Sequence, residues 1–281
     1  MILPAIAAIV SGILLGITES INKNITETRF SAFAYSFLQT FLNFAFYLVP
    51  FLLFSKLPAW HMSYFLVFVN ASILFFSNIF VIKAYKTEDI SIVTILIRTS
   101  LVVAFLNGIF LLSESLSLIK IIGVGTILIG ILIIFYENKK IKLTIGLILA
   151  LSAGILWGFV TYFSKLILKT FDPLSYLVLV QLITASLLFL VPRTRRDLPN
   201  IVKIYKWKIL LSRITAVSAI YLIVWSIQNG NISIVNTNFE TFALLSSVLI
   251  GIFILKEKTQ LIKKFVGMGF CILGIIFLNF F

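Results

Sequence analysis

The stretch that decides the fold occurs twice in the chain. Residues 8–23 read AIVSGILLGITESINK, and residues 150–165 read ALSAGILWGFVTYFSK. At an offset of 142 positions both segments carry the pattern Gly-Ile-Leu-x-Gly, followed by a lysine at the same distance. Apolar composition produces chance matches of Ile and Leu, but it does not produce a matching series of Gly and Lys. We therefore interpret the two segments as copies of an internal repeat.

The repeat continues in order along both halves of the chain. The motif Ile-Ser-Ile-Val at residues 90–93 recurs at residues 232–235, and Glu114 is matched by Glu257. Three glycines near the end of the first half have counterparts in the second: Gly123, Gly125 and Gly130 correspond to Gly267, Gly269 and Gly274. We divide the chain into two related halves, residues 1–140 and residues 141–281.

The composition places these halves in a membrane. Of the 281 residues, 60% are hydrophobic and only 12% are charged, which a water-soluble domain of this size could not accommodate. Apolar runs of about 20 residues, enough to cross the hydrocarbon core as helices, recur from end to end. The predicted spans are 3–22, 31–54, 64–85, 90–112, 118–136, 144–168, 173–192, 207–228, 232–254 and 262–280.

Each half contains five of these spans, and five is an odd number. The second half must therefore enter the membrane in the orientation opposite to that of the first. The predicted fold is an all-α membrane protein of ten transmembrane helices, arranged as an inverted repeat of two five-helix halves. Secondary transporters use this architecture, because two pseudo-symmetric halves can open a central site to each side of the membrane in turn.

The repeated motifs also resemble a known family. Gly12 to Gly16 with Lys23, and Gly154 to Gly158 with Lys165, are similar to the drug/metabolite transporter superfamily in its EamA branch. The resemblance covers both halves. It implies ten helices, a central cavity and the transport of metabolites such as amino acids. One feature departs from the branch: a proline often found early in the fourth and ninth helices is missing here.

Four charged side chains fall inside the predicted spans: Glu19, Arg98, Arg213 and Glu240. A charge costs about 2.5 to 3.5 kcal/mol at the centre of a span on insertion scales, so each needs a partner or a function. Arg98 and Glu240 are repeat equivalents, and each lies about eight residues into its span, roughly 12 Å deep. They are therefore expected to meet near the middle of the membrane.

Two interpretations of these charges are open. In the first, they line a central cavity and bind a zwitterion or a dipole, together with Asn236 and Asn238. In the second, Arg98 forms a buried ion pair with Glu240 or Glu19 that holds the halves together. The two are not exclusive. The predicted substrate-binding residues are Glu19, Arg98, Trp157, Arg213, Tyr221, Trp225, Asn236, Asn238 and Glu240, with the aromatic side chains as apolar walls.

A carboxyl group in a dehydrated cavity can also carry a proton in each transport cycle. Glu19 and Glu240 are the candidates for such coupling. Other residues have structural interpretations. The paired glycines of each Gly-xxx-Gly motif are expected to allow close helix contact, and Glu114 and Glu257 are expected to anchor helix ends.

The remaining function classes are less well supported. The net charge of +13 comes mainly from residues between the spans, where anionic lipids attract Lys and Arg, so nucleic-acid binding is not expected. A membrane enzyme would need a nucleophile with a base or a metal site, but His61 and Cys271 stand alone. No cofactor is expected, and a purely structural bundle would leave the duplication unexplained. The expected location is the plasma membrane, and the oligomeric state is not indicated.

The charge distribution and the family resemblance predict opposite orientations in the membrane. Lys and Arg concentrate in the odd-numbered loops, and the tendency of such residues to stay in the cytoplasm would place both termini on the other side. The family resemblance implies termini in the cytoplasm.

Overall fold

The computed structural model describes residues 2–26, 32–88, 93, 96–135, 144–253 and 261–280. Within these residues the regular structure is helical, with no strand, as the all-α prediction requires. Glu257 lies outside the described residues. The helices are α1 (Ile2–Thr26), α2 (Ala32–Phe54), α3 (Ser63–Thr87), α5 (Thr99–Leu112), α6 (Leu118–Phe135), α7 (Ile145–Ile167), α8 (Pro173–Leu190), α9 (Pro192–Asn229), α10 (Ile232–Phe253) and α11 (Leu261–Phe280).

The helices form one bundle whose outer surface is apolar. In the described part of the chain, seven helices are long and apolar enough to cross a membrane, and α5 and α6 are shorter apolar helices. Large apolar side chains are exposed on the outside, among them Phe54, Phe110 and Ile262 at 79%, 75% and 81%. Such a surface is stable against lipid and not against water. The chain is therefore a multi-pass integral membrane protein.

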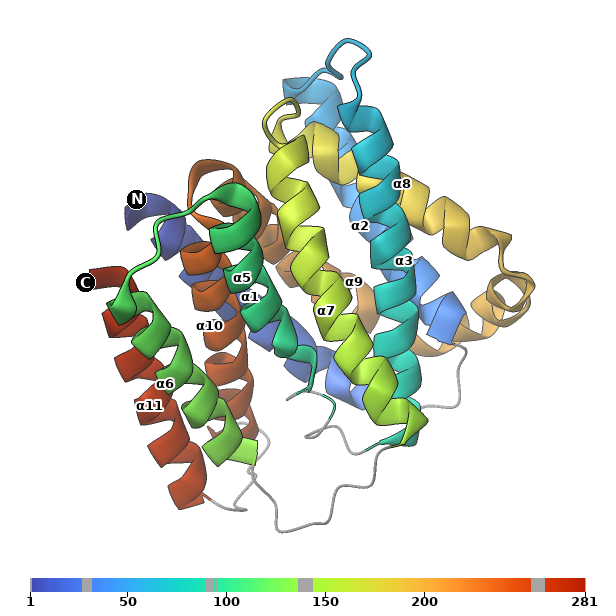
Figure 1. Cartoon of the computed structure of the whole chain (residues 1–281). Coiled ribbons are helices and arrows are strands. Elements are labelled where there is room, and N and C mark those ends of the chain that lie inside the picture. The colour runs from blue at the N-terminus through green and yellow to red at the C-terminus, as the bar shows by residue number, and fades with distance from the viewer. Residues whose placement is uncertain are drawn as a thin grey trace.

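The helices are arranged in three groups (Figure 1). Helices α6 and α11 form one flank, α2, α3, α8 and α9 lie at the other, and α1, α5, α7 and α10 lie between them. Helix α1 begins and α11 ends at the same end of the bundle. The connections at residues 55–62, 113–117, 168–172 and 230–231 lie at that end as well. The chain thus crosses the bundle back and forth, as the predicted spans require.

Glycines set the contact between α6 and α11. A Cβ atom added to Gly123 would lie 2.9 Å from the carbonyl oxygen of Gly274, and one added to Gly130 would lie 2.6 Å from that of Gly267. Only hydrogen atoms fit at these places, so the two backbones touch directly. The partner number falls as the residue number rises, and the two helices therefore run antiparallel.

The paired Gly-xxx-Gly motifs make two further contacts of this kind. A Cβ on Gly16 of α1 would lie 2.7 Å from the carbonyl oxygen of Ala243 on α10. A Cβ on Gly154 of α7 would lie 2.7 Å from the carbonyl oxygen of Ile97, just before α5. The predicted packing role of these motifs is confirmed. They bring the first helix of each half against a helix of the other half.

Polar side chains define several helix ends. The Asp172 side chain accepts hydrogen bonds from the backbone N–H groups of Leu174 and Ser175, at 2.9 and 3.1 Å, and Pro173 fills the first turn of α8. Burial acts to raise the pKa of the Asp172 carboxyl, but hydrogen bonds from the Ser175 and Ser55 side chains and from the backbone outweigh it, so this pKa lies below its ordinary value. The cap is therefore charged at neutral pH.

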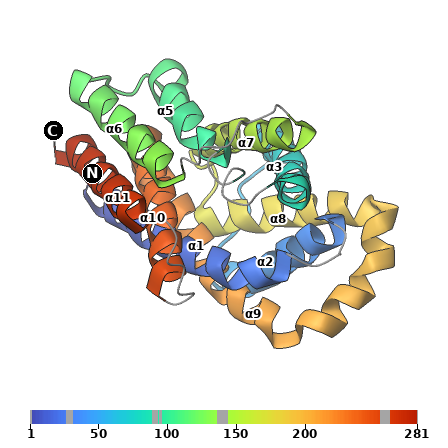
Figure 2. The same ribbon diagram turned by 90° about the horizontal axis from the view of Figure 1, so that it is seen from below.

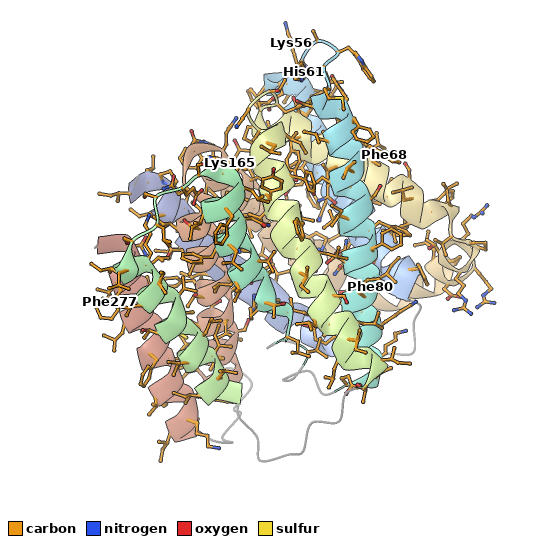
Figure 3. The ribbon with its side chains drawn as sticks, in the orientation of Figure 1. Lys56, His61, Phe68, Phe80, Lys165 and Phe277 are labelled. Carbon is orange, nitrogen blue, oxygen red and sulfur yellow. The ribbon has the colours of Figure 1, made fainter. Side chains whose placement is uncertain are left out.

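The turn between α9 and α10 is held by two charged side chains. Glu114 accepts hydrogen bonds from the backbone N–H groups of Ile232 and Ser233, at 2.5 and 3.0 Å, at the first turn of α10. Lys165 of α7 (Figure 3) donates to three carbonyl groups at the end of α9, those of Ile227, Gln228 and Gly230 at 2.7, 3.0 and 2.8 Å. Each charge has the sign that the helix dipole favours. The anchoring role predicted for Glu114 is confirmed.

One boundary differs from the sequence prediction. Residues 193–206 were expected to form a loop containing Pro199, but α9 already begins at Pro192 and is 38 residues long. Pro192 lies at the first turn, where no backbone N–H is needed, and Pro199 lies inside the helix. Figure 2 shows that α9 changes direction along its length, as an internal proline would cause. A proline and several arginines resemble a loop signal, yet here they form the start of a helix.

The close contact between α1 and α10 leads to a first prediction. Gly16→Ala should lower the melting temperature of the detergent-purified protein, because the added methyl group meets the Ala243 carbonyl and forces the helices apart, at about 1 to 3 kcal/mol. The control is Gly125→Ala, since a Cβ at Gly125 meets no atom within 4 Å. Equal melting temperatures for the two variants would show that α1 and α10 do not pack through Gly16.

Candidate functional site

Three charged side chains from three elements meet in the middle group of helices. Arg98, which immediately precedes α5, donates a hydrogen bond from one terminal nitrogen of its guanidinium to a carboxylate oxygen of Glu240 on α10. Its other terminal nitrogen lies 3.5 Å from a carboxylate oxygen of Glu19 on α1. The expected pairing of Arg98 with Glu240, and with Glu19, is confirmed. We call Arg98, Glu19 and Glu240 the ion triad.

The members of the ion triad differ in burial. The Arg98 and Glu240 side chains are 4% and 5% exposed, whereas that of Glu19 is 38% exposed. Glu19 lies seven residues after Gly12 and three after Gly16, so it is on the face of α1 that packs against α10. It therefore points into the bundle. Because desolvation of a charge is costly, the fully buried pair depends on its mutual attraction and on its hydrogen bonds.

Two serines complete the carboxylate contacts. The Ser100 hydroxyl donates to Glu240 at 2.9 Å, and the Ser247 hydroxyl donates to Glu19 at 3.0 Å. Neither serine was among the predicted site residues. Ser247 lies seven residues after Glu240, on the same face of α10, so helical spacing was the signal that could have identified it. Ser100 lies two residues after Arg98, a spacing that puts it on another face, so no such signal marked it in the sequence.

Two buried donors near the ion triad have no protein acceptor. Asn236 lies one helical turn before Glu240, and its carbonyl oxygen accepts a hydrogen bond of 3.3 Å from Thr161 on α7. Its amide nitrogen has no hydrogen-bond partner, and neither does Nε of Arg98. An unsatisfied buried donor typically costs about 1 to 3 kcal/mol. Each of these two donors lacks an acceptor group.

Asn238 lies in a different environment from Asn236. Its amide pairs reciprocally with that of Asn279 on α11, through two hydrogen bonds of 2.9 Å. The structure thus places Asn238 at the contact between α10 and α11, where its side-chain amide is hydrogen-bonded to Asn279.

The predicted aromatic wall residues come from α7 and α9, and of these the structure places Trp157 nearest in packing to the ion triad. Trp157 of α7 is half-buried and packs against a cluster that includes Val93 and Ile97, close in sequence to Arg98. Tyr221 of α9 packs against the cluster that joins α2, α8 and α9, and Trp225 is half-buried one turn further along α9. The structure gives neither Tyr221 nor Trp225 a contact with the ion triad.

Arg213, the fourth predicted charge, is not part of the ion triad. It is 4% exposed on α9, and its Nε donates to the Ser212 hydroxyl at 3.3 Å. Among the described residues no carboxylate lies within ion-pair distance of it. The same part of the chain holds no group of three or more His, Cys, Asp or Glu side chains that could bind a metal ion.

Comparisons with known proteins add a family and a fold. The sequence profile of the EamA-like transporter family matches residues 2–136 and, a second time, residues 144–280. No curated protein matches the chain. One solved crystal structure, whose description names no function, superposes on this chain with a TM-score of 0.74. The match covers 99% of this chain and 96% of the other, at 14% sequence identity. At that identity the likeness shows the fold alone.

The burial of the ion triad leads to a second prediction. Glu240→Ala should destabilise the protein by about 3 to 5 kcal/mol, because Arg98 then loses the carboxylate that it is buried against. The double variant Arg98→Met with Glu240→Leu should recover most of that loss, since both members of the buried pair are removed and only the more exposed Glu19 loses a partner. Thermal unfolding in detergent measures both. If the loss of stability in the double variant equals the sum of the losses from the two single substitutions, the two side chains are not coupled.

Proposed function

The chain belongs to the EamA-like transporter family, and we propose that it carries a small polar organic molecule, an amino acid or a similar metabolite, across the plasma membrane. The carried molecule binds at the ion triad and is exposed to each side in turn. The observation that carries the proposal is a buried ionic site, formed by helices of both halves, in a chain of this family. Members of this family are transporters, and we assign the chain no catalytic activity.

The proposal includes ten spans arranged in two inverted halves. The contact of α6 with α11 supports the inverted arrangement. Gly123 and Gly130 correspond by repeat to Gly267 and Gly274. Gly123 contacts the equivalent of Gly130, and Gly130 contacts the equivalent of Gly123. Reciprocal contacts of this kind arise from a two-fold axis between the copies. Because the helices are antiparallel, the axis lies across them, as an inverted repeat requires.

A second pair of contacts follows the same symmetry. Gly12 of α1 lies against the carbonyl of Phe239, and Gly154 of α7 lies against the carbonyl of Ile97. Both the glycines and their partners differ by 142 positions, the offset of the repeat. Each half therefore supplies its first helix to the other half. Such interlocked halves can rock against each other about a shared centre.

The Arg98–Glu240 pair lies where the halves meet, since the two residues are also 142 positions apart. A rocking motion changes the distance between such a pair. In the proposed mechanism polar groups of the substrate replace part of the ion-pair contacts during the motion. The site therefore keeps its charges paired at each stage, which lowers the free-energy cost of moving buried charges.

The transport proposal leads to a third prediction. Proteoliposomes that contain the purified protein should take up at least one member of a panel of amino acids and other small polar metabolites. Asn236→Ala should raise the KM for that molecule about tenfold, because one hydrogen bond to a buried acceptor is worth about 1.4 kcal/mol. Asn229→Ala, at the exposed end of α9, is the control. Protein-free vesicles that match the uptake would contradict transport.

Proton coupling by Glu19 is a second element of the proposal. The ion triad contains one guanidinium and two carboxylates, so it carries one negative charge in excess. The groups that face Glu19 are Arg98 and Glu240, with the Ser247 hydroxyl. Glu19 is the more exposed carboxylate and the more weakly held, at 3.5 Å from Arg98. It is therefore the group that exchanges a proton with water as the site opens.

This coupling gives a fourth prediction. An inwardly directed proton gradient should accelerate uptake by the unmodified protein, and Glu19→Gln should remove the acceleration while leaving exchange without a gradient, because glutamine cannot carry the proton. Ser247→Ala, which leaves the carboxyl group in place, should keep the response. A gradient response that survives in Glu19→Gln would exclude Glu19 as the coupling group.

A further inference from the structure

Arg213 is a buried cation outside the ion triad. Its side chain is enclosed by α2 and α9 and is 4% exposed. A guanidinium stays protonated at any pH that a cell experiences. The groups shown near it are the Ser212 hydroxyl, at 3.3 Å from Nε, and the phenol groups of Tyr35 and Tyr47. All of these are neutral at neutral pH, so they solvate the charge without balancing it.

The carboxylates of the described residues are all engaged elsewhere. Glu19 and Glu240 bind Arg98, and Asp197 binds Arg196. The other three hold hydroxyl or backbone groups: Glu88 with Thr144, Glu114 with the first turn of α10, and Asp172 with the first turn of α8. A buried charge without a counter-charge costs several kcal/mol. Within the described part of the chain, no carboxylate therefore balances the charge of Arg213.

A polar stripe on α2 faces the same place. Ser36, Thr40, Asn43 and Tyr47 follow each other at helical spacing, and all four are buried. Tyr47 donates a hydrogen bond of 2.8 Å to the carbonyl of Val217, one turn beyond Arg213 on α9. The hydroxyl of Ser36 and the amide oxygen of Asn43 have no hydrogen-bond partner. Of these two groups, the Ser36 hydroxyl can donate to an anion, whereas the Asn43 amide oxygen can only accept.

The stripe and Arg213 lie at the same depth. Tyr35 packs with Ile201 and Ile209, and Tyr47 reaches Val217, so the numbers rise together and α2 runs parallel to this part of α9. Asn43 lies one turn before Tyr47, and Arg213 lies one turn before Val217. The two residues therefore face each other at the same level of the bundle.

From this arrangement we propose that Arg213 binds a carboxylate group of the transported molecule. The charge decides the class of anion. One guanidinium surrounded by neutral groups balances a single negative charge, whereas a doubly charged phosphate would leave one charge uncompensated in a medium of low dielectric constant. A planar carboxylate also matches the fork of the guanidinium. The proposal predicts that neutral sugars and purely cationic amines are not substrates.

The site lies beside the ion triad. The hydroxyls of Thr18 on α1 and Thr215 on α9 are 2.8 Å apart. Glu19 follows Thr18 directly, and Arg213 precedes Thr215 by two residues. Arg213 and Glu19 thus belong to neighbouring helices, each within two residues of this cross-link. In this proposal the carboxylate site forms one end of the substrate site. This inference rests on the transport function proposed above and narrows its substrate class.

The test measures binding to the purified full chain in detergent, without transport. The probes are L-alanine, propionate, inorganic phosphate and L-alaninamide, which lacks the carboxylate, and the readout is the melting temperature. Carboxylate probes should raise the melting temperature by several degrees, as any ligand selective for the native state does. The amide and phosphate should not. Arg213→Met should abolish the shift, and Arg196→Met, at an exposed arginine, should retain it.

A second readout separates a ligand site from a structural charge. If Arg213 has no counter-charge in the protein, Arg213→Met without ligand should melt at the same temperature as the unmodified protein or higher, because an unbalanced buried charge is removed. A lower melting temperature for Arg213→Met, with partial recovery in Arg213→Lys, which keeps the charge, would assign Arg213 a structural ion pair and overturn the proposal. A carboxylate shift that persists in Arg213→Met would overturn it as well.

The failure of transport and the failure of this inference can be told apart. If carboxylates bind through Arg213 but proteoliposomes take up nothing from the panel, the site stands and the transport function fails. If uptake occurs and is equally fast in Arg213→Met and unmodified protein, transport stands and the carboxylate site fails. The inference predicts that Arg213→Met lowers uptake at low substrate concentration by more than tenfold.

Discussion

The structure depends on the cost of placing charge inside a membrane. Arg98, Glu19 and Glu240 are stable there only because they meet, and they come from three elements of two different halves. The pair that is most deeply buried joins residues at equivalent positions of the repeat. The buried charge of Glu240, in the second half, is thus balanced by Arg98 of the first half. In the proposed function, these charges are also the centre at which a polar molecule binds.

Close helix packing brings these charges together. Glycines of the repeated motif let the first helix of each half approach a helix of the other half until backbone atoms touch. In lipid there is little hydrophobic force between helices, so such contacts and the hydrogen bonds across them hold the bundle together. The end of the bundle at the α9–α10 turn is fixed by Lys165 and Glu114, which cap helices through their dipoles. The site is therefore built at an interface that is tight at the backbone and polar at the side chains.

Much of this arrangement could be predicted from the sequence, for physical reasons. The pairing of Arg98 with Glu240 could be predicted from the offset of the repeat. Symmetry relates equivalent positions, and depth in the membrane follows from the helical rise. The face of Asn238 could not be predicted. Helix α10 carries polar residues on several sides, so their spacing does not reveal that Asn238 turns to Asn279. The predicted beginning of α9 was also wrong. A proline at the first turn of a helix gives the same sequence signal as a loop.

The most direct test of the central claim measures access to the ion triad from each side of the membrane. Ser100 lies against Glu240, and Cys271 is the single cysteine of the chain. In a Cys271→Ala background, Ser100→Cys can be labelled with a membrane-impermeant thiol reagent in vesicles of defined orientation. A site that opens alternately should react from both sides, and a transported substrate should slow the reaction from each. Reaction from one side only under every condition would contradict alternating access through this site.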